Sequence, residues 1–413
     1  METTATGEKK YGFWPKFAVI SLICIQFTQA FAAPALASIQ ASFPNVDPTI
    51  VQQIIALPTM LMVVSSIFCG RLCAAIGYRK SAYIAIVLAL LGGVMPAIMH
   101  SSIGIILFWR AVFGLGYGLV FALCISSINV LWSGKEQKMM IGLETFIGAA
   151  CAMGYSYLSG VLAGINWVYV FWSYLIVVPF AIVIIAFLPE PPKEKLAVPL
   201  VKEDKVKGGF GNFYWMFIIL AAISVIFTAA FMNNVAMVIM GNGIGQPHDI
   251  GFAMTFFSLL FSIGGLLYVP LRKVIGRFMI PVLLVIFGID TIMMTRTLNL
   301  STFVALTAIY GALFSLLNCE YNVLSGTTVK SRARIGDGVS LYIAGQGVGQ
   351  FVGPFVCAGL AGLLGFTGPN YQLLVSGPVM LAAGIVLCII VAIKKGDPTV
   401  AKYVEDQKSA AAK

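Results

Sequence analysis

The chain has 413 residues, of which 59% are apolar and only 10% are charged, and it carries a formal net charge of +10. Soluble domains carry about 25% charged residues, so this composition excludes an ordinary water-soluble protein. It predicts an all-α integral membrane protein.

Apolar runs of roughly 20 residues can cross a bilayer as helices, and the sequence contains twelve such runs. They lie at about 13–39, 50–70, 81–99, 104–132, 139–164, 167–188, 213–240, 250–269, 278–296, 302–326, 338–364 and 372–394. The first run is too long for a cleaved signal peptide.

A stretch rich in proline, lysine and glutamate, 189–212, divides the chain almost in half and reads as a linker. We therefore expect a tail at 1–12, a six-helix bundle at 13–188, the linker at 189–212, a second six-helix bundle at 213–395 and a tail at 396–413.

The basic residues define the orientation. If the N-terminus is cytoplasmic, all but two of the 26 Lys and Arg residues fall in cytoplasmic segments, the exceptions being Arg110 and Arg296. This is the positive-inside rule, and it predicts a multi-pass plasma-membrane protein, of a bacterial inner membrane type, with both termini in the cytoplasm. The net positive charge is thus explained by the orientation of the chain in the membrane. We expect the protein to lie in a lipid bilayer and to have no nucleic-acid partner.

The segment Gly70–Lys80 is short, framed by glycines and basic, and it is predicted to be a tight cytoplasmic loop between the second and third helices. Related residues recur 199 positions later, where Leu72 matches Leu271 and Gly77 matches Gly276. The same offset aligns Gly148, Gly154 and Gly160 with Gly347, Gly353 and Gly359. The two bundles are therefore expected to be pseudo-symmetric.

Polar residues inside the spans are candidate functional groups. Gln26 and Gln29 are three residues apart, on one face of the first helix. Arg110 lies inside the fourth helix, where a cation is expensive unless it faces a polar interior or reaches the headgroups. It precedes Gly114, Gly116 and Gly118.

The spans contain three carboxylates, Glu144, Asp290 and Glu320. A buried carboxyl group can exchange protons near neutral pH. Glu320 points about 200° away from Asn318 around the helix, so it either acts in coupling or gating against a neighbouring helix or forms a structural ion pair with a cytoplasmic arginine. Glu144 either takes part in coupling or gating, or its side chain reaches water at the inner end of the helix. Asp290 either pairs with Arg296 or lies at an interface.

These features together resemble the major facilitator superfamily over almost the full length. Gly70–Lys80 is similar to that family's loop motif between helices two and three, glycine-x-leucine-x-aspartate-x-x-glycine with basic residues, except that Ala74 replaces the aspartate, which in the family helps to latch the outward-facing state. Arg110 and its glycines resemble the helix-four signature linked to proton coupling. The glycine-proline pair of many family antiporters is absent from helix five, which has Gly154 and Tyr155 instead.

The resemblance implies alternating access around a site lined by helices one, four, seven and ten. The candidate substrate-binding residues are Gln26, Gln29, Arg110, Tyr117, Asn233, Asn234, Asn318, Tyr321 and Gln346. The candidate coupling or gating residues are Glu144, Asp290, Glu320, Arg110, Gly70, Gly77 and Arg79. For each glutamine or asparagine, the alternative is a hydrogen bond between helices. For Arg110, it is a role in coupling or packing only.

We expect a transporter of a small organic solute, such as a carboxylate, driven by protons or by its own gradient and working as a monomer. The alternative within transport is proton-coupled efflux of hydrophobic drugs. A membrane sensor or enzyme is less well supported, because both tails are short, the two histidines lie in outer turns and no phosphate-binding loop is present.

No cofactor or metal is expected. The cysteines are interpreted as packing residues without disulfides, and only Cys69 and Cys73 have helical spacing.

Overall fold

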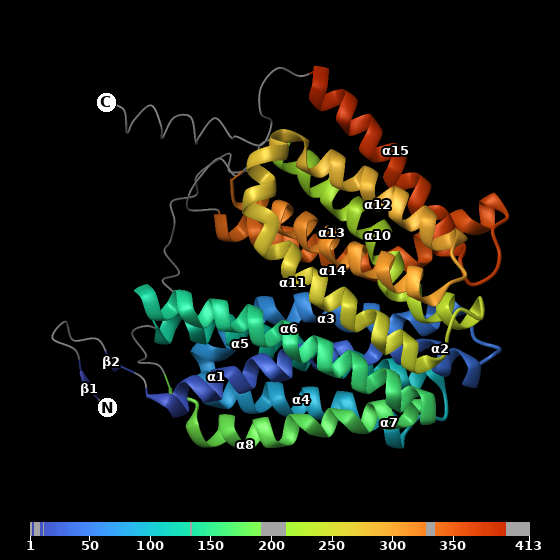
Figure 1. The fold of residues 1–413 in the computed structure, drawn as a ribbon. Coiled ribbons are helices and arrows are strands. Elements are labelled where there is room, and N and C mark those ends of the chain that lie inside the picture. The colour runs from blue at the N-terminus through green and yellow to red at the C-terminus, as the bar shows by residue number, and fades with distance from the viewer. Residues whose placement is uncertain are drawn as a thin grey trace, which may run out of the picture. The chain divides into compact units, whose positions relative to one another are not determined.

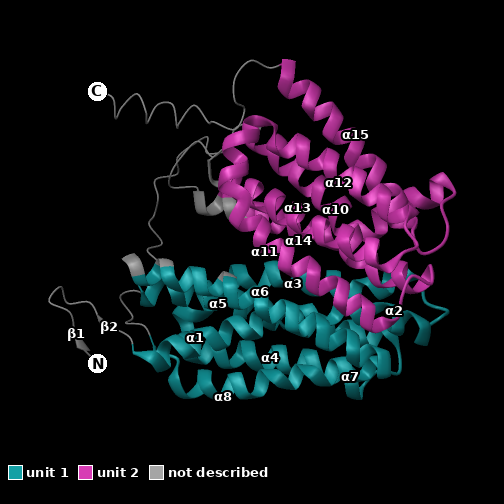
Figure 2. Cartoon of the chain, in the orientation of Figure 1, with its two compact units in different colours: residues 1–201 teal, residues 202–413 magenta. Residues whose placement is uncertain are grey.

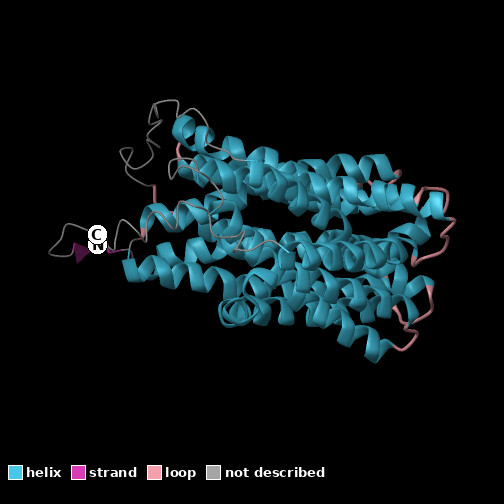
Figure 3. Cartoon of the chain, turned by 90° about the horizontal axis from the view of Figure 1, so that it is seen from above, coloured by secondary structure: helices cyan, strands magenta, loops and turns pink. Residues whose placement is uncertain are grey.

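The computed structural model describes residues 2–3, 9–10, 12–132, 134–190, 212–327 and 335–393. Most of the predicted linker and the whole of the tail at 396–413 lie outside these ranges. Within them, β1 (Glu2–Thr3) and β2 (Lys9–Lys10) pair as short antiparallel strands, and every other element is helical (Figures 1 and 3). The all-α membrane fold is therefore confirmed.

The chain divides into two compact units, residues 1–201 and 202–413 (Figure 2). The first unit contains α1 (Phe13–Gln26), η1 (Phe27–Phe31), α2 (Ala32–Ser42), α3 (Pro48–Ile76), α4 (Tyr78–Ile98), α5 (Ile103–Leu131), α6 (Gly134–Ile165), α7 (Trp167–Trp172), η2 (Ser173–Ile176) and α8 (Val177–Phe187). The second contains α10 (Asn212–Gly241), α11 (Pro247–Ile275), η3 (Gly276–Phe278), α12 (Met279–Arg296), α13 (Leu300–Thr327), α14 (Ile335–Leu364) and α15 (Tyr371–Ile393). The η elements are 3-10 turns.

Eleven segments of the described residues are long and apolar enough to cross a membrane, and one of them, Pro247–Arg296, has 50 residues. A straight helix of that length would extend about 75 Å, whereas the hydrocarbon core is about 30 Å thick. This segment contains α11 and α12, which meet at Gly276 with φ +60°. It therefore crosses twice, and each unit has six spans, as the sequence predicts.

The two units repeat one packing pattern. In the first, α3 packs on α5, α4 packs on α7, η2 and α8, and η1 and α2 pack on α6. In the second, α11 packs on α13, α12 packs on α15, and α10 packs on α14. The second, third and first helices of each unit thus take the fourth, sixth and fifth as partners, which agrees with the predicted internal repeat.

The predicted loop at Gly70–Lys80 is shorter than expected. Helix α3 continues through Arg71 to Ile76, and α4 begins at Tyr78, so the turn consists of Gly77 alone. The helix continues because its last turns emerge where water and headgroups solvate the basic side chains, so nothing forces it to end with the apolar run. It ends where Gly77 adopts φ +92°, ψ 164°, a combination that is accessible essentially to glycine only.

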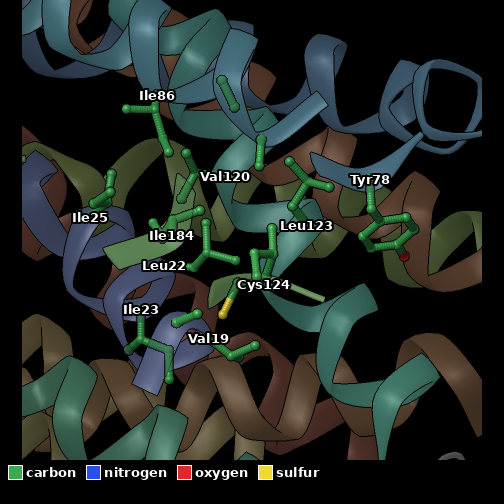
Figure 4. Packing of buried hydrophobic residues seen from close by; sticks show 14 of the residues in the cluster. Val19, Leu22, Ile23, Ile25, Tyr78, Ile86, Val120, Leu123, Cys124 and Ile184 are labelled. Carbon is green, nitrogen blue, oxygen red and sulfur yellow. The ribbon is translucent and has the colours of Figure 1, made fainter. Parts of the chain in front are cut away.

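The core of the first unit is apolar and contributed by several helices. Leu22 of α1, Val120 and Leu123 of α5 and Ile184 of α8 belong to one buried cluster (Figure 4). Close helix contacts depend on glycine, because a Cβ at Gly116 would overlap the backbone of α4. This packing fixes α5, and with it the charged residue in its interior.

Candidate functional site

Arg110 is completely buried in the first unit, 0% exposed. Its Nε donates to the Ile54 carbonyl at 2.9 Å, one terminal nitrogen donates to the Tyr174 hydroxyl at 3.0 Å, and the other donates to Gln29 Oε1 at 2.7 Å. The guanidinium carbon also lies 4.4 Å from the centre of the Phe113 ring. Among the described residues no carboxylate contacts this cation, so neutral groups alone stabilise it.

The three partners of Arg110 come from places where helices lose regular α geometry. Gln29 lies in η1 and Tyr174 in η2. Pro58, inside α3, has no N–H, so the Ile54 carbonyl four residues earlier lacks its usual intrahelical donor. Arg110 supplies the missing donor and connects helices one, two and six of the unit through a helix-four side chain.

Gln29 and Arg110, both predicted site residues, are thus in direct contact. Gln29 also donates to the Ile55 carbonyl at 3.2 Å. Gln26 belongs to a different contact, since its Nε2 donates to Glu144 Oε1 at 3.2 Å. Tyr117 is partly exposed and stacks on Phe113, on the same side of α5 as Arg110.

At the end of this unit where α3 and α4 meet, the carboxylate of Glu190 caps α4. It accepts from the backbone N–H of Tyr78 at 2.7 Å and of Arg79 at 2.9 Å, an arrangement favoured by the positive end of the helix dipole. The Arg79 guanidinium donates to the Ala186 carbonyl at 3.4 Å. The segment that follows α8 is thereby attached to the turn between helices two and three.

We predict that Gly77→Ala destabilises the protein, whereas Gly70→Ala does not. A Cβ at Gly77 would lie 2.6 Å from Glu190 Oε1, and its backbone angles are unsuited to alanine, so the expected loss is about 1–3 kcal/mol. A Cβ at Gly70 meets nothing within 4 Å, and alanine in a helix interior gains up to about 1 kcal/mol over glycine. Thermal unfolding in detergent measures both changes, and equal midpoints for the two variants would contradict the prediction.

In the second unit, Glu320 of α13 is 1% exposed and contacts α11. Arg272 Nε lies 2.9 Å from Glu320 Oε2, and the Tyr268 hydroxyl donates to the same oxygen at 2.8 Å. Of the two roles left open by the sequence, these contacts correspond to the ion pair with a cytoplasmic arginine.

Asp290 on α12 is 4% exposed, and its Oδ2 has no hydrogen-bond partner among the described residues. The described part of the chain contains no ion pair between Asp290 and Arg296, whose side chain is exposed. Asn233 of α10 is also completely buried, with no partner in the described residues for either polar side-chain atom. Asp290 and Asn233 are thus the predicted site residues of the second unit that have buried polar atoms without a hydrogen-bond partner in the described residues.

The other predicted residues of this unit make local contacts, and the structure does not bring them into one cluster. Asn234 Nδ2 donates to the Pro369 carbonyl at 2.7 Å. The remaining pairs are Tyr321 with Ser224 at 2.6 Å, Asn318 with Asn322 at 2.6 Å, and Gln346 with Tyr342. Tyr321 is 1% exposed and fills the interior of the unit. Of these contacts, only the Tyr321–Ser224 contact joins two helices, α13 and α10, whereas Asn234 bonds to a loop carbonyl and Gln346 bonds within α14.

Sequence reasoning missed three participants. Pro58 carried a usable signal, because a proline within an apolar run releases a carbonyl that a buried donor can bind. Glu190 follows Pro189 at the start of the linker, where a carboxylate is easily interpreted as merely solvated. Tyr174 carried no signal, because 64 residues separate it from Arg110 and only tertiary packing brings them together.

Two units of six membrane-spanning helices with buried polar groups define a membrane transporter of the two-bundle type. The sequence model of the Major Facilitator Superfamily matches residues 18–227, about half of the chain, and the chain belongs to this superfamily. The resemblance found in the sequence is thus confirmed, and the protein is a transporter rather than an enzyme.

Two curated relatives are described as the MFS-type efflux pump MMF1, from Pseudozyma antarctica (strain T-34) and Mycosarcoma maydis. Both are 27% identical to this chain, over 182 and 174 residues. The matches cover 43% and 41% of this chain but 33% and 28% of the relatives. The similarity therefore spans about a third of the relatives' length.

Solved structures show the fold. The inward-open xylose transporter XylE from E. coli has a TM-score of 0.67 at 15% identity, covering 93% of this chain and 97% of that one. The nucleoside transporter NupG has a TM-score of 0.75 at 11% identity, covering 90% and 99%. A bacterial homologue of the lysosomal transporter Spinster has a TM-score of 0.69 at 13% identity, covering 93% and 96%.

Proposed function

We propose that this chain moves a small, uncharged and largely apolar organic solute across the plasma membrane by alternating access, coupled to protons, as a monomer. The observation that carries the choice of substrate is the enclosure of Arg110. A cation that is 0% exposed and donates to Ile54, Tyr174 and Gln29 offers no open site to a substrate carboxylate. The expectation of an organic-anion substrate depended on this arginine and loses its main support.

Aromatic side chains support an apolar substrate. In the second unit, Phe257 of α11 contacts Phe261, and both rings contact Phe314 of α13. Phe261 and Phe314 remain partly exposed, and Phe314 shares a helical stripe with Asn318. A surface that is mostly aromatic, with a few amide groups, suits solutes with an apolar body and few polar atoms.

Proton-coupled efflux of hydrophobic compounds is the second candidate function. It is favoured by the description of both curated relatives as efflux pumps. The same aromatic surface would serve either direction of transport. The direction is decided by whether an inward proton gradient depletes or accumulates the solute.

The substrate proposal is tested with two aromatic solutes that differ only in a carboxamide or a carboxylate group. We expect protein-dependent exchange in proteoliposomes for the carboxamide and little for the carboxylate, because transfer of an ionised carboxylate into a site without an available cation is strongly unfavourable. Protein-free liposomes correct for passive leakage. Faster exchange of the carboxylate would overturn the proposal and restore the organic anion.

Asp290 supports the proton coupling. Of the three carboxylates in the spans, Glu320 contacts Arg272, and Glu144 is half-buried and accepts from Gln26. Asp290 is buried with an oxygen that lacks a donor in the described residues, so of the three carboxylates it has the most bonding capacity left for a proton. A group that is neutral when closed in and ionised when water reaches it can carry a proton.

We predict that Asp290→Asn reduces substrate-dependent proton movement by about a hundredfold or more, the range assigned to groups that transfer protons. Protein stability should stay unchanged or rise, because an amide replaces an isolated carboxyl. A pH-sensitive dye in proteoliposomes measures the proton movement. Asp47→Asn is the matched control, since Asp47 caps α3 by accepting from the Thr49 N–H at 2.7 Å and asparagine caps equally well. Unimpaired proton movement in Asp290→Asn would exclude this residue.

A further inference from the structure

Two cysteines lie side by side in the last turns of α3, at and within the segment Gly70–Lys80. Cys69 Sγ and Cys73 Sγ are 3.9 Å apart, and the two residues are 3% and 5% exposed. Cys69 Sγ also lies 3.9 Å from the Leu119 carbonyl of α5. The pair thus belongs to the apolar cluster that also contains Leu123 and Cys124 (Figure 4).

The spacing of the two sulfurs limits what they can bind. Soft centres prefer thiolate ligands over oxygen ligands, and a structural zinc ion needs four nitrogen or sulfur ligands. Within the described ranges, no three His, Cys, Asp or Glu side chains are placed to share a metal ion. We infer that Cys69 and Cys73 form a chelating site for a thiophilic metal or metalloid that binds two sulfurs, of which trivalent arsenic is the representative.

The reaction with an arylarsine oxide needs no oxidant. Two S–H bonds and the arsenic–oxygen double bond break, and two arsenic–sulfur bonds form. The oxygen leaves as water with both thiol protons. Arsenic remains trivalent, and both sulfurs keep the oxidation state of a thiol. The reagent is uncharged and apolar, so it can reach the buried pair through the bilayer or detergent.

The geometry favours this pair over the other interacting thiols. Cys24 and Cys151 also form a hydrogen bond, but they lie on α1 and α6, so a common ligand has to hold two helices together. Cys69 and Cys73 are one turn apart on one helix, and the second bond closes a ring whose backbone the helix already holds in place. Such a ring raises the effective concentration of the second thiol, so chelation is stronger than binding to either cysteine alone by about a hundredfold or more.

The test is intact-protein mass spectrometry of the purified full chain with phenylarsine oxide. We expect one aryl-arsenic group for each protein molecule, which excess monothiol leaves in place and a dithiol removes. In Cys69→Ser and in Cys73→Ser, retention after the monothiol wash should fall about a hundredfold. Cys357→Ser is the control, because Cys357 is a buried single cysteine of α14. Unchanged thermal midpoints show that the serine variants are folded.

Three results would overturn the inference. The first is no stable adduct on the parent protein at reagent excess. The second is an adduct that survives in both Cys69→Ser and Cys73→Ser. The third is loss of the adduct in Cys24→Ser while Cys69 and Cys73 are intact, which would assign the site to the pair between α1 and α6.

Discussion

Replacement of Arg110 by alanine should lower the free energy of unfolding by about 1–3 kcal/mol for each buried acceptor that is left without its donor, and should abolish transport. The substitution removes the donor for the Ile54 carbonyl, which Pro58 deprives of an intrahelical partner, and leaves the Tyr174 hydroxyl and Gln29 Oε1 without their partner. Thermal unfolding in detergent and exchange in proteoliposomes measure the two effects. Arg296→Ala is the control, because Arg296 is exposed at the end of α12.

The role of Pro58 allows a sharper version of this experiment. Pro58→Ala restores an N–H that can bond to the Ile54 carbonyl within α3, so that carbonyl no longer depends on Arg110. In the Pro58→Ala background, Arg110→Ala should therefore cost about 1 kcal/mol less than in the parent protein, the net value of one hydrogen bond. A double-mutant cycle measures the difference. Strict additivity would show that the Ile54 contact contributes nothing and that the other two partners explain the whole effect.

The membrane makes this fold readable from the sequence. Every backbone polar group in the hydrocarbon needs a partner within the protein, so long apolar runs become helices, and the basic loops determine their orientation. Both rules act locally and require no knowledge of contacts. The end of α3 was misplaced because the apolar run stops near Gly70 while the helix continues to Ile76. Outside the hydrocarbon, hydropathy no longer limits a helix.

The candidate site was only partly readable, for a physical reason. The spacing of residues along one helix could place Gln29 on a helix face and Arg110 inside the bundle, because both inferences need the sequence of that helix alone. It could not choose which of many polar groups would meet across helices. Asn234, predicted for the substrate, contacts the loop carbonyl of Pro369, a partner that its position on the helix does not predict. For Glu320 the helical angle correctly excluded the stripe of Asn318, and the partner Arg272 became visible only with the packing of α11 on α13.

The ion pair of the second unit should respond unequally to removal of its two members. Arg272→Gln is expected to destabilise the protein by about 3–5 kcal/mol, because Glu320, with a side chain that is 1% exposed, then loses its cation inside the bundle. Glu320→Gln should cost about 1 kcal/mol. The Arg272 side chain is 23% exposed and can turn its charge toward water, while Tyr268 still has an oxygen to which it can donate.

The unequal effects of the two substitutions distinguish an ion pair that stabilises the fold from a carboxylate that takes part in proton coupling. Thermal midpoints in detergent should rank Arg272→Gln below Glu320→Gln. The double variant Arg272→Gln/Glu320→Gln should return to near the midpoint of Glu320→Gln, because the buried carboxylate that lost Arg272 is then absent as well. Lys273→Gln, at an exposed neighbouring position, controls for the lost positive charge. If Glu320→Gln instead leaves stability intact and abolishes proton movement, Glu320 rather than Asp290 is the proton carrier, and its contact with Arg272 is the closed state of a coupling switch.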